Sequence, residues 1–220
     1  ASAADPVTIS VSVSGHDTPL EAYVDPANEY ARIRIPAPVD VQYIDSHPVI
    51  DFGGISHMVV SGIEATEQSF EALKAKAYRA FSDMMAFGVM FLDPAAGSTA
   101  SAPDGSMSSA PDCTGSTASA PDSAGTACDA SSGSCSMTPV VYVRDTDTTY
   151  FEGSCASGSA AAACAKALSE ASDSGTFAYE FRQPAGTLST CVVKENGKIT
   201  SVELGGHVEI SEVITIGIDA

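Results

Sequence analysis

Basic residues are scarce in this sequence. The 220-residue chain has only 10 lysines and arginines against 28 aspartates and glutamates, which gives a formal net charge of −18. Proteins that bind nucleic acid or anionic lipid carry clustered positive charge. The charge balance therefore disfavours both classes of ligand, and we predict that neither nucleic acid nor a membrane is a partner.

Long hydrophobic runs are also missing. No apolar stretch approaches the roughly 18 residues that a helix needs to span a bilayer. Hydrophobic residues nevertheless make up 44% of the chain, which is enough to build a core. We expect a soluble, folded protein with one large domain or two small ones.

Metal-binding patterns are absent as well. The six cysteines include no Cys-x-x-Cys pair, and the four histidines are scattered, so a zinc site has little support and no metal is predicted. We expect mostly free thiols, a reducing compartment and a cytoplasmic location. The sequence begins at Ala1 without an initiator methionine, which suggests that a preceding segment was removed or left out.

One segment, residues 94–137, consists mainly of Ala, Ser, Gly, Pro, Asp and Thr. Within it, the tetrapeptide Ser-Ala-Pro-Asp recurs, starting at Ser101, Ser109 and Ser119. Such a composition cannot bury enough apolar surface to offset the entropy of ordering it. We predict a flexible, disordered insertion on the surface of the fold.

Short strands are predicted on both sides of this insertion. The segment 7–14 alternates between apolar and polar residues with a period of two, which is typical of a half-buried strand. Glu195-Asn196-Gly197 predicts a tight hairpin turn. Further strands are predicted at residues 30–35, 56–60, 139–144, 176–182, 188–194, 198–204 and 207–218.

Two helices are predicted between these strands. Residues 65–85 place apolar side chains at helical spacing behind Thr66, a candidate N-cap, and we interpret the stripe as core. Residues 158–171 are rich in alanine, so neighbouring elements can pack closely against them. The pattern is that of an α+β protein in which sheets wrap helices.

Cys155 stands at the turn from a strand to the alanine-rich helix. Backbone N–H groups at a helix N-terminus favour negative charge, so this position predicts a lowered thiol pKa and thiolate chemistry. A half-buried structural cysteine beside a tight turn fits the local pattern equally well, because free cysteines are commonly buried.

Four landmarks occur in the order found in one enzyme family. They are the segments Gly53–Val59, Phe87–Phe91, Cys155–Gly158 and Gly205–Ile210. The first is similar to the Gly-Asn-Pro-His segment of the diaminopimelate epimerase family, and the third takes the place of its second Cys-Gly-Thr-Gly. The run Phe151–Cys155 is more similar to the histidine-racemase branch. The resemblance implies the diaminopimelate epimerase-like fold, with mixed and antiparallel sheets wrapped around a central helix.

The resemblance also implies a division of the chain. Residues 1–45 resemble the remainder of the first domain, residues 46–205 the second domain with the insertion, and residues 206–220 a strand that returns to the first domain. Family members carry two such cysteines on two pseudo-symmetric domains, and this chain shows only the second. The first domain is therefore expected to be incomplete, with the other cysteine on a missing N-terminal half or on a companion chain.

The implied activity is racemisation or epimerisation of an amino acid without a cofactor. Inverting the α-carbon needs proton removal on one face and proton delivery on the other, and Cys155 serves as the catalytic group on one face. The N–H groups of residues 156–159 at the helix start, Ser159 included, would hold the substrate carboxylate. The expected substrate-binding residues are His57, Glu152, Ala156, Ser157 and Gly158.

Two alternatives remain open at this stage. One is a non-catalytic β-rich binding or surface module with a flexible Ser/Ala/Pro/Asp spacer, which the repeats and the acidity fit. The other is an isomerase of the same fold that uses different acid and base residues, as in PrpF-like relatives. We also consider a homodimer.

Overall fold

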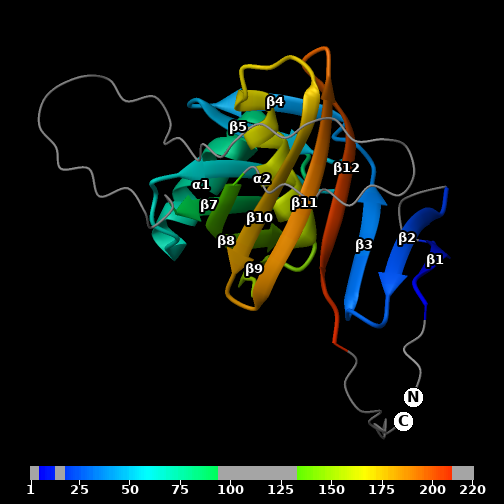
Figure 1. Cartoon of the computed structure of the whole chain (residues 1–220). Coiled ribbons are helices and arrows are strands. Elements are labelled where there is room, and N and C mark those ends of the chain that lie inside the picture. The colour runs from blue at the N-terminus through cyan, green and yellow to red at the C-terminus, as the bar shows by residue number, and fades with distance from the viewer. Residues whose placement is uncertain (1–4, 13–17, 94–132, 210–220) are drawn as a thin grey trace, which may run out of the picture.

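The computed structural model describes residues 5–12, 18–93 and 133–209, which form strands and two helices (Figure 1). The helices are α1 (Glu67–Ala80) and α2 (Ala156–Ser169). The strands are β1 (Val7–Val11), β2 (Leu20–Asp25), β3 (Tyr30–Ile35), β4 (Asp40–Ile44), β5 (His47–Asp51), β6 (Ser56–Ser61), β7 (Ala86–Asp93), β8 (Gly133–Val143), β9 (Thr148–Phe151), β10 (Gly175–Gln183), β11 (Gly186–Glu195) and β12 (Lys198–His207).

The strands form one mixed sheet. Its order is β1-β2-β3-β12-β11-β10-β8-β7-β6-β5-β4, and β9 pairs with β8 beside this path. The pairings β6–β7 and β8–β10 are parallel, and the rest are antiparallel. Parallel neighbours need a crossover connection, and α1 and α2 lie in these two crossovers. The α+β class expected from the sequence is confirmed.

Helix α2 lies inside the curve of this sheet. Strands from both halves of the sheet contact it, namely β5, β6 and β7 on one side and β10, β11 and β12 on the other. In Figure 1 the helix lies behind β10 and β11. Four consecutive alanines, residues 160–163, are completely buried. Their small side chains let strands approach the helix from several directions, so the predicted wrapping of a helix by sheet is confirmed.

Strands β6 and β7 are buried on both faces. Val59 and Met90 belong to the core around α2, whereas Val60 and Phe91 belong to a second core under α1. Because successive side chains of a strand point to opposite faces, the two strands supply both cores. Residues 56–60 of β6 are therefore buried, whereas Ser61 at the end of the strand is exposed.

Helix α1 begins where the sequence predicted. The Ser69 N–H donates to Thr66 Oγ1 at 3.1 Å, so Thr66 is the N-cap. Phe70 is completely buried in the core under α1, which confirms the interpretation of the apolar stripe. The helix ends at Ala80 because Phe81 adopts an extended backbone, so the predicted end at residue 85 was too late. The alanine-rich helix starts two residues earlier than predicted, at Ala156.

The insertion ends earlier than predicted. Strand β8 begins at Gly133, inside the expected insertion 94–137, and Cys135 and Met137 are buried there. These two apolar side chains alternate with polar ones, so this part of the segment can contribute to the core. Residues 94–132, and the part of the predicted last strand from residue 210 onward, lie outside the described residues.

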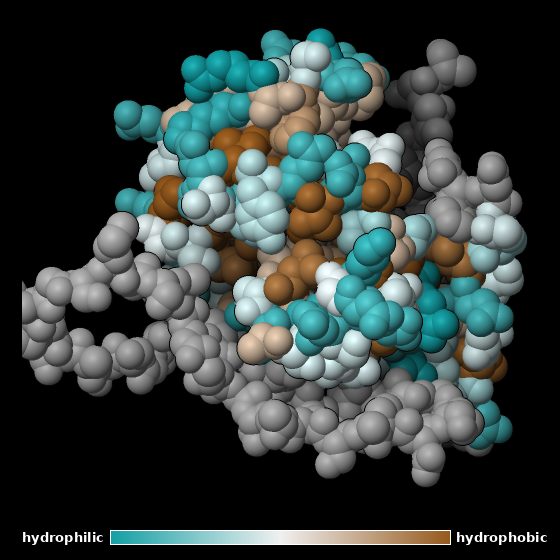
Figure 2. Space-filling model, turned by 90° about the horizontal axis from the view of Figure 1, so that it is seen from above, coloured by the Kyte–Doolittle hydropathy of each residue, from teal (hydrophilic) through white to brown (hydrophobic). Residues whose placement is uncertain are grey.

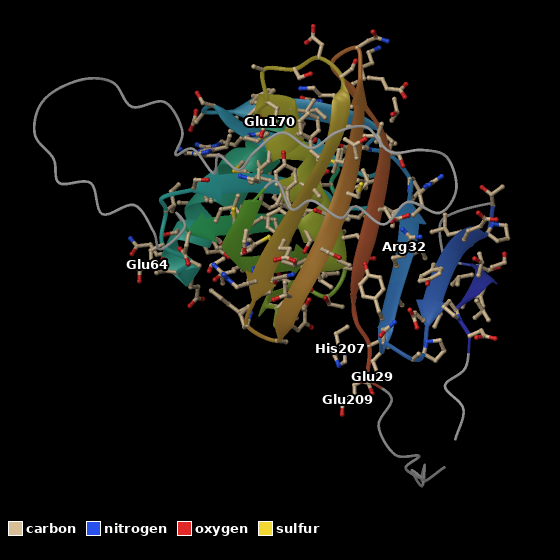
Figure 3. All side chains as sticks on the ribbon, in the orientation of Figure 1. Glu29, Arg32, Glu64, Glu170, His207 and Glu209 are labelled. Atoms are coloured by element: carbon tan, nitrogen blue, oxygen red, sulfur yellow. The ribbon has the colours of Figure 1, made fainter. Side chains whose placement is uncertain are left out.

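The β3–β12 pairing joins the first three strands to the rest of the sheet. Tyr30 pairs with His207, and the His207 imidazole lies 3.6 Å from the Glu29 carboxylate, as Figure 3 shows at the end of β12. The domain boundaries expected from the sequence stay a prediction.

Hydrophilic and hydrophobic groups are interspersed on the face seen in Figure 2. Within the part of the chain that the structure describes, no helix is both long and apolar enough to cross a membrane.

The hairpin between β11 and β12 also closes the far end of α2. Asn196 and Gly197 have φ values of 51° and 75°, as the predicted Asn-Gly turn requires. Just before this turn, the buried Lys194 ammonium donates to the carbonyls of Ala167 and Glu170 at 2.8 and 2.9 Å. A cation at a helix C-terminus satisfies carbonyls that lack an intrahelical partner.

Replacing Lys194 with Met keeps much of the side-chain length but removes this donor. We expect the Lys194→Met variant to lower the free energy of unfolding by about 1–3 kcal/mol, because the buried Ala167 carbonyl and the Glu170 carbonyl each lose a hydrogen bond. Urea denaturation measures the change. Lys198→Met, at an exposed position of the same hairpin, is the matched control, with an expected change under about 0.5 kcal/mol. Equal changes in both variants would contradict the capping role of Lys194.

Candidate functional site

Cys155 is the N-cap residue of α2 and is 7% exposed. Its backbone is extended, and the loop before it is tied to the β10–β11 turn by a bond from the Ala185 N–H to the Gly153 carbonyl at 2.7 Å. The predicted strand, turn and helix around this cysteine are therefore present. The thiol lies where β9, α2 and the end of β10 meet.

Gln183 fixes the backbone of Cys155. Its Oε1 accepts the Cys155 N–H at 2.8 Å, and its Nε2 donates to Ser159 Oγ at 3.0 Å. Ser159 Oγ in turn donates to the Cys155 carbonyl at 2.8 Å. The three residues form a closed ring of hydrogen bonds around the first turn of α2. Sequence reasoning missed Gln183 because it lies 28 residues from Cys155, at the end of a strand with no motif.

The pKa of the Cys155 thiol is raised to about 12, first by burial and then by the side chain of Glu152. The Gly158 N–H and the Ser157 hydroxyl act in the opposite direction. The predicted lowering by the helix N-terminus is thus present but is outweighed, because a thiolate loses its hydration in a buried site. The prediction of a lowered pKa was wrong for this chain, and the resting group is a thiol.

His57 contacts the site through Ser157. Its Nε2 lies 2.9 Å from Ser157 Oγ, and Ser157 Oγ lies 3.7 Å from Cys155 Sγ. His57 is completely buried, and burial lowers its pKa to about 3, so the imidazole is neutral. His57 is therefore not at an exposed cleft edge, and its expected contact with a substrate stays a prediction.

Two glycines make room for these contacts. Gly88 pairs with His57 across β6 and β7, and a Cβ atom there would lie 2.3 Å from His57 Nδ1. A Cβ atom at Gly158 would lie 2.1 Å from Met90 Sδ and 3.1 Å from Cys155 Sγ. Side chains at these two positions would displace the groups that surround the thiol.

The first turn of α2 supplies backbone N–H groups. The Ser159 N–H is used by the Cys155 carbonyl at 3.0 Å, which leaves those of Ala156, Ser157 and Gly158 without a partner inside the helix. The expectation that the Ser159 N–H also holds a carboxylate is therefore corrected. Glu152, Ala156, Ser157 and Gly158 do lie around Cys155, but their roles toward a substrate stay predictions.

The other thiols differ from one another. Cys164 is free and buried, nine positions further along α2, and burial raises its pKa to about 12. Cys191 is disulfide-bonded and is an exception to the expectation that the thiols are mostly free. In the ranges 5–12, 18–93 and 133–209, no group of three His, Cys, Asp or Glu side chains is arranged to hold a metal ion.

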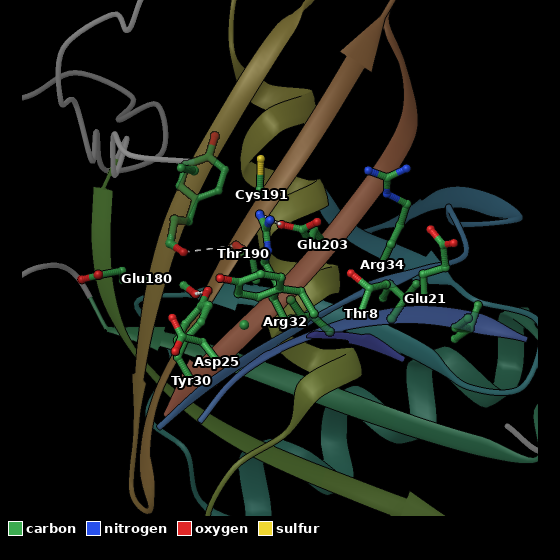
Figure 4. A pocket seen from close by; sticks show the side chains of 18 of the residues that line it. Thr8, Glu21, Asp25, Tyr30, Arg32, Arg34, Glu180, Thr190, Cys191 and Glu203 are labelled. Carbon is green, nitrogen blue, oxygen red and sulfur yellow. Dashed lines mark hydrogen bonds and ion pairs between the residues drawn. The ribbon is translucent and has the colours of Figure 1, made fainter. Parts of the chain in front are cut away.

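A cavity of about 1110 Å³ lies on the other side of the sheet, and Figure 4 shows it from close by. Strands β1, β2, β3, β10, β11 and β12 line it, and its charged groups include Arg32, whose guanidinium lies 3.1 Å from Glu203. None of the hydrogen-bond partners of Cys155 lines this cavity. The cavity is large, but it is therefore separate from the site around Cys155.

Residues 131–214 match the family model of the N-terminal domain of the histidine racemase CntK. The match supports a place in the racemase and epimerase superfamily, including its histidine-racemase branch. The matched range contains Cys155 and Gln183, whereas His57 lies outside it. The matched model is an N-terminal domain, although the resemblance to the diaminopimelate epimerase family implies that the Cys155 motif belongs to the second of two pseudo-symmetric domains. The order of the domains therefore stays a prediction.

Among the solved structures similar to the chain is a probable proline racemase from Agrobacterium radiobacter K84 with bound carbonate. It is 11% identical, with a TM-score of 0.42. The alignment covers 95% of this chain but 61% of that one, so the chain spans less than two thirds of its length. A likeness this distant carries no argument. No curated protein matches the chain.

We expect Glu152→Gln to lower the pKa of the Cys155 thiol, because the variant removes the negative charge beside the sulfur. Alkylation of Cys155 by iodoacetamide, followed peptide by peptide in a mass spectrometer, should become about twofold to tenfold faster at pH 8. Glu195→Gln, at an exposed site, should leave the rate unchanged. If Glu152→Gln and the unsubstituted chain were alkylated at the same rate, the effect of the Glu152 carboxylate on the pKa of Cys155 would be refuted.

The same raised pKa has a consequence for stability. The folded state holds the thiol proton more tightly than the unfolded chain, whose ordinary value is 9.0. This contribution is therefore fully present below about pH 9 and is lost as the pH rises toward about 12. Urea titrations at several alkaline pH values should show a smaller loss of stability in Cys155→Ser than in the unsubstituted chain.

Proposed function

We propose that this chain is part of a cofactor-independent amino-acid racemase or epimerase, in which Cys155 exchanges a proton with the α-carbon of the substrate. The observation that carries the proposal is a buried thiol at the start of a helix whose first N–H groups have no intrahelical partner. The match of residues 131–214 to a histidine racemase domain supports it.

Cys155 acts as the proton donor in one direction of the reaction. A second group, acting as the base, removes the α-proton from the opposite face. The electron pair of the broken C–H bond stays on the α-carbon, and the resulting carbanion is stabilised by the substrate carboxylate. Cys155 then transfers its S–H proton to the α-carbon and is left as a thiolate. In the reverse direction the thiolate removes the proton that it delivered. The raised pKa of the thiol suits the donor role, because the group holds its proton at neutral pH.

The surroundings of the thiol match the charges of an amino acid. The N–H groups of Ala156, Ser157 and Gly158 would donate hydrogen bonds to the substrate carboxylate at the positive end of α2. The Glu152 carboxylate would bind the ammonium group. An ammonium there would offset the negative charge that now raises the pKa of Cys155, so substrate binding would itself favour proton transfer.

The second base comes from outside the described residues in this proposal. Cys164 lies on the same helix, about 13 Å further along its axis by helical geometry, and is completely buried. Neither its position nor its burial suits the opposite face of a substrate at Cys155. We propose that a second cysteine is supplied by another segment of the protein or by a companion chain.

A non-catalytic module remains the second candidate. The specific observation in its favour is the same raised pKa of Cys155, since burial in an apolar site also raises the pKa of an inert structural cysteine. The two candidate functions predict different outcomes for an amino acid: a racemase exchanges its α-proton with solvent, whereas a non-catalytic module does not.

Exchange of the α-proton into deuterated water decides between them. A panel of amino acids with histidine first, because of the matched domain, is followed by proton NMR with this chain and with a protein that also carries the second cysteine. We expect exchange with the two-cysteine protein and little or none with this chain alone. In the two-cysteine protein, Cys155→Ser should slow exchange at least about a hundredfold.

The matched control is Cys164→Ala, which removes a buried thiol of the same helix without burying a hydroxyl and should leave exchange within about twofold. Exchange that survives Cys155→Ser would exclude Cys155 as the acid or base. The absence of exchange for every amino acid in the two-cysteine protein would favour the non-catalytic module.

A further inference from the structure

The buried imidazole of His57 has one unsatisfied nitrogen. Nε2 bonds to Ser157 Oγ at 2.9 Å, whereas Nδ1 has no partner although it is buried against Gly88. A neutral imidazole carries one N–H group and one lone pair. A buried N–H group without a partner is rarer in proteins than an acceptor left without one. The hydrogen is therefore on Nε2, and the lone pair is on Nδ1.

This tautomer determines the direction of the next hydrogen bond. If Nε2 donates to Ser157 Oγ, the serine oxygen acts as the acceptor and its own hydrogen remains available. Cys155 Sγ lies 3.7 Å from the same oxygen, within the range of hydrogen bonds to sulfur. In the other tautomer the serine would donate to His57 and would have no hydrogen left for the sulfur.

We propose that His57 is a positioning residue for Cys155: it holds Ser157 Oγ as an acceptor, so that the Ser157 O–H points at the sulfur and stabilises its thiolate form. His57 touches neither the sulfur nor a substrate in this role, and it acts through Ser157 alone. Its effect opposes that of Glu152, the ionisable side chain among the described residues that acts directly on Cys155. The catalytic importance of this role rests on the proposed function, whereas the hydrogen bonds from His57 to Ser157 and from Ser157 to the sulfur do not.

A double-mutant cycle on the thiol tests the proposal without requiring catalysis. His57→Leu and Ser157→Ala should each slow alkylation of Cys155 by iodoacetamide about threefold to tenfold at a fixed pH near 9, because the thiolate loses one hydrogen bond. In the Ser157→Ala background, His57→Leu should have no further effect. His57→Gln, which retains an N–H donor, and Ser157→Thr, which retains the hydroxyl, should stay closer to the unsubstituted rate.

Cys164 provides the internal control. It lies on the same helix, is completely buried and has no polar partner among the causes of its raised pKa. Its alkylation should be unchanged in all variants. Independent slowing by His57→Leu in both backgrounds, or no slowing in the Ser157→Ala variant, would overturn the proposal.

Nitrogen NMR of the unsubstituted chain gives a second test that does not depend on the folding of a variant. Two-bond couplings between ring nitrogens and carbon-bound hydrogens distinguish the two tautomers of His57. We expect the hydrogen on Nε2 from pH 6 to 9, whereas a hydrogen on Nδ1 would overturn the proposal. If the two-cysteine protein showed no α-proton exchange while His57 kept this tautomer, the result would instead contradict the proposed function.

Discussion

The burial of α2 inside the curved sheet is the constraint on which the rest of the structure depends. Only a helix with very small side chains can be approached by strands from both halves of the sheet, and residues 160–163 are all alanine and all buried. At the start of this helix Cys155 is buried as well, although Ala156 beside it is exposed. The ring formed by Gln183, Ser159 and the backbone of Cys155 satisfies the N–H and the carbonyl of this buried cysteine.

Burial also changes the chemistry of the thiol. An exposed cysteine at a helix N-terminus would ionise more easily, but the enclosed Cys155 has a raised pKa, and Glu152 raises it further. The Gly158 N–H and the Ser157 hydroxyl oppose this rise in pKa, and they are also groups that a substrate carboxylate would approach. The balance between burial, Glu152 and these donors thus decides whether Cys155 is protonated and can act as an acid, or is ionised and can act as a base.

Much of the fold could be predicted from local patterns. Thr66 as an N-cap and the Asn196-Gly197 turn each depend on a few neighbouring residues, and each is confirmed. The period of two at residues 7–14 correctly predicts a strand, β1, but not its half-burial, because Val7 and Ile9 are exposed. The placement of Cys155 before an alanine-rich helix is equally local. The resemblance to a racemase family also rested on short segments, and the domain match at residues 131–214 supports it.

The remaining features depend on contacts that no local pattern encodes. His57 and Ser157 are 100 residues apart, and Gln183 is 28 residues from Cys155, so neither partnership could be inferred from spacing. The thiol pKa depends on the layers that cover α2, which explains why its predicted direction was wrong. Cys135, in sequence that resembles the insertion, is buried because β8 pairs with strands far away in the chain.

The central claim is that Cys155 rests as an enclosed thiol and not as a thiolate. A carbon NMR titration of the chain with cysteine labelled at Cβ tests it directly, because the Cβ shift changes when the sulfur loses its proton. We predict that the Cys155 signal stays at the thiol position from about pH 6 to 9, below its pKa of about 12. A transition near neutral pH would contradict the account, since it would mean that the helix N-terminus outweighs burial.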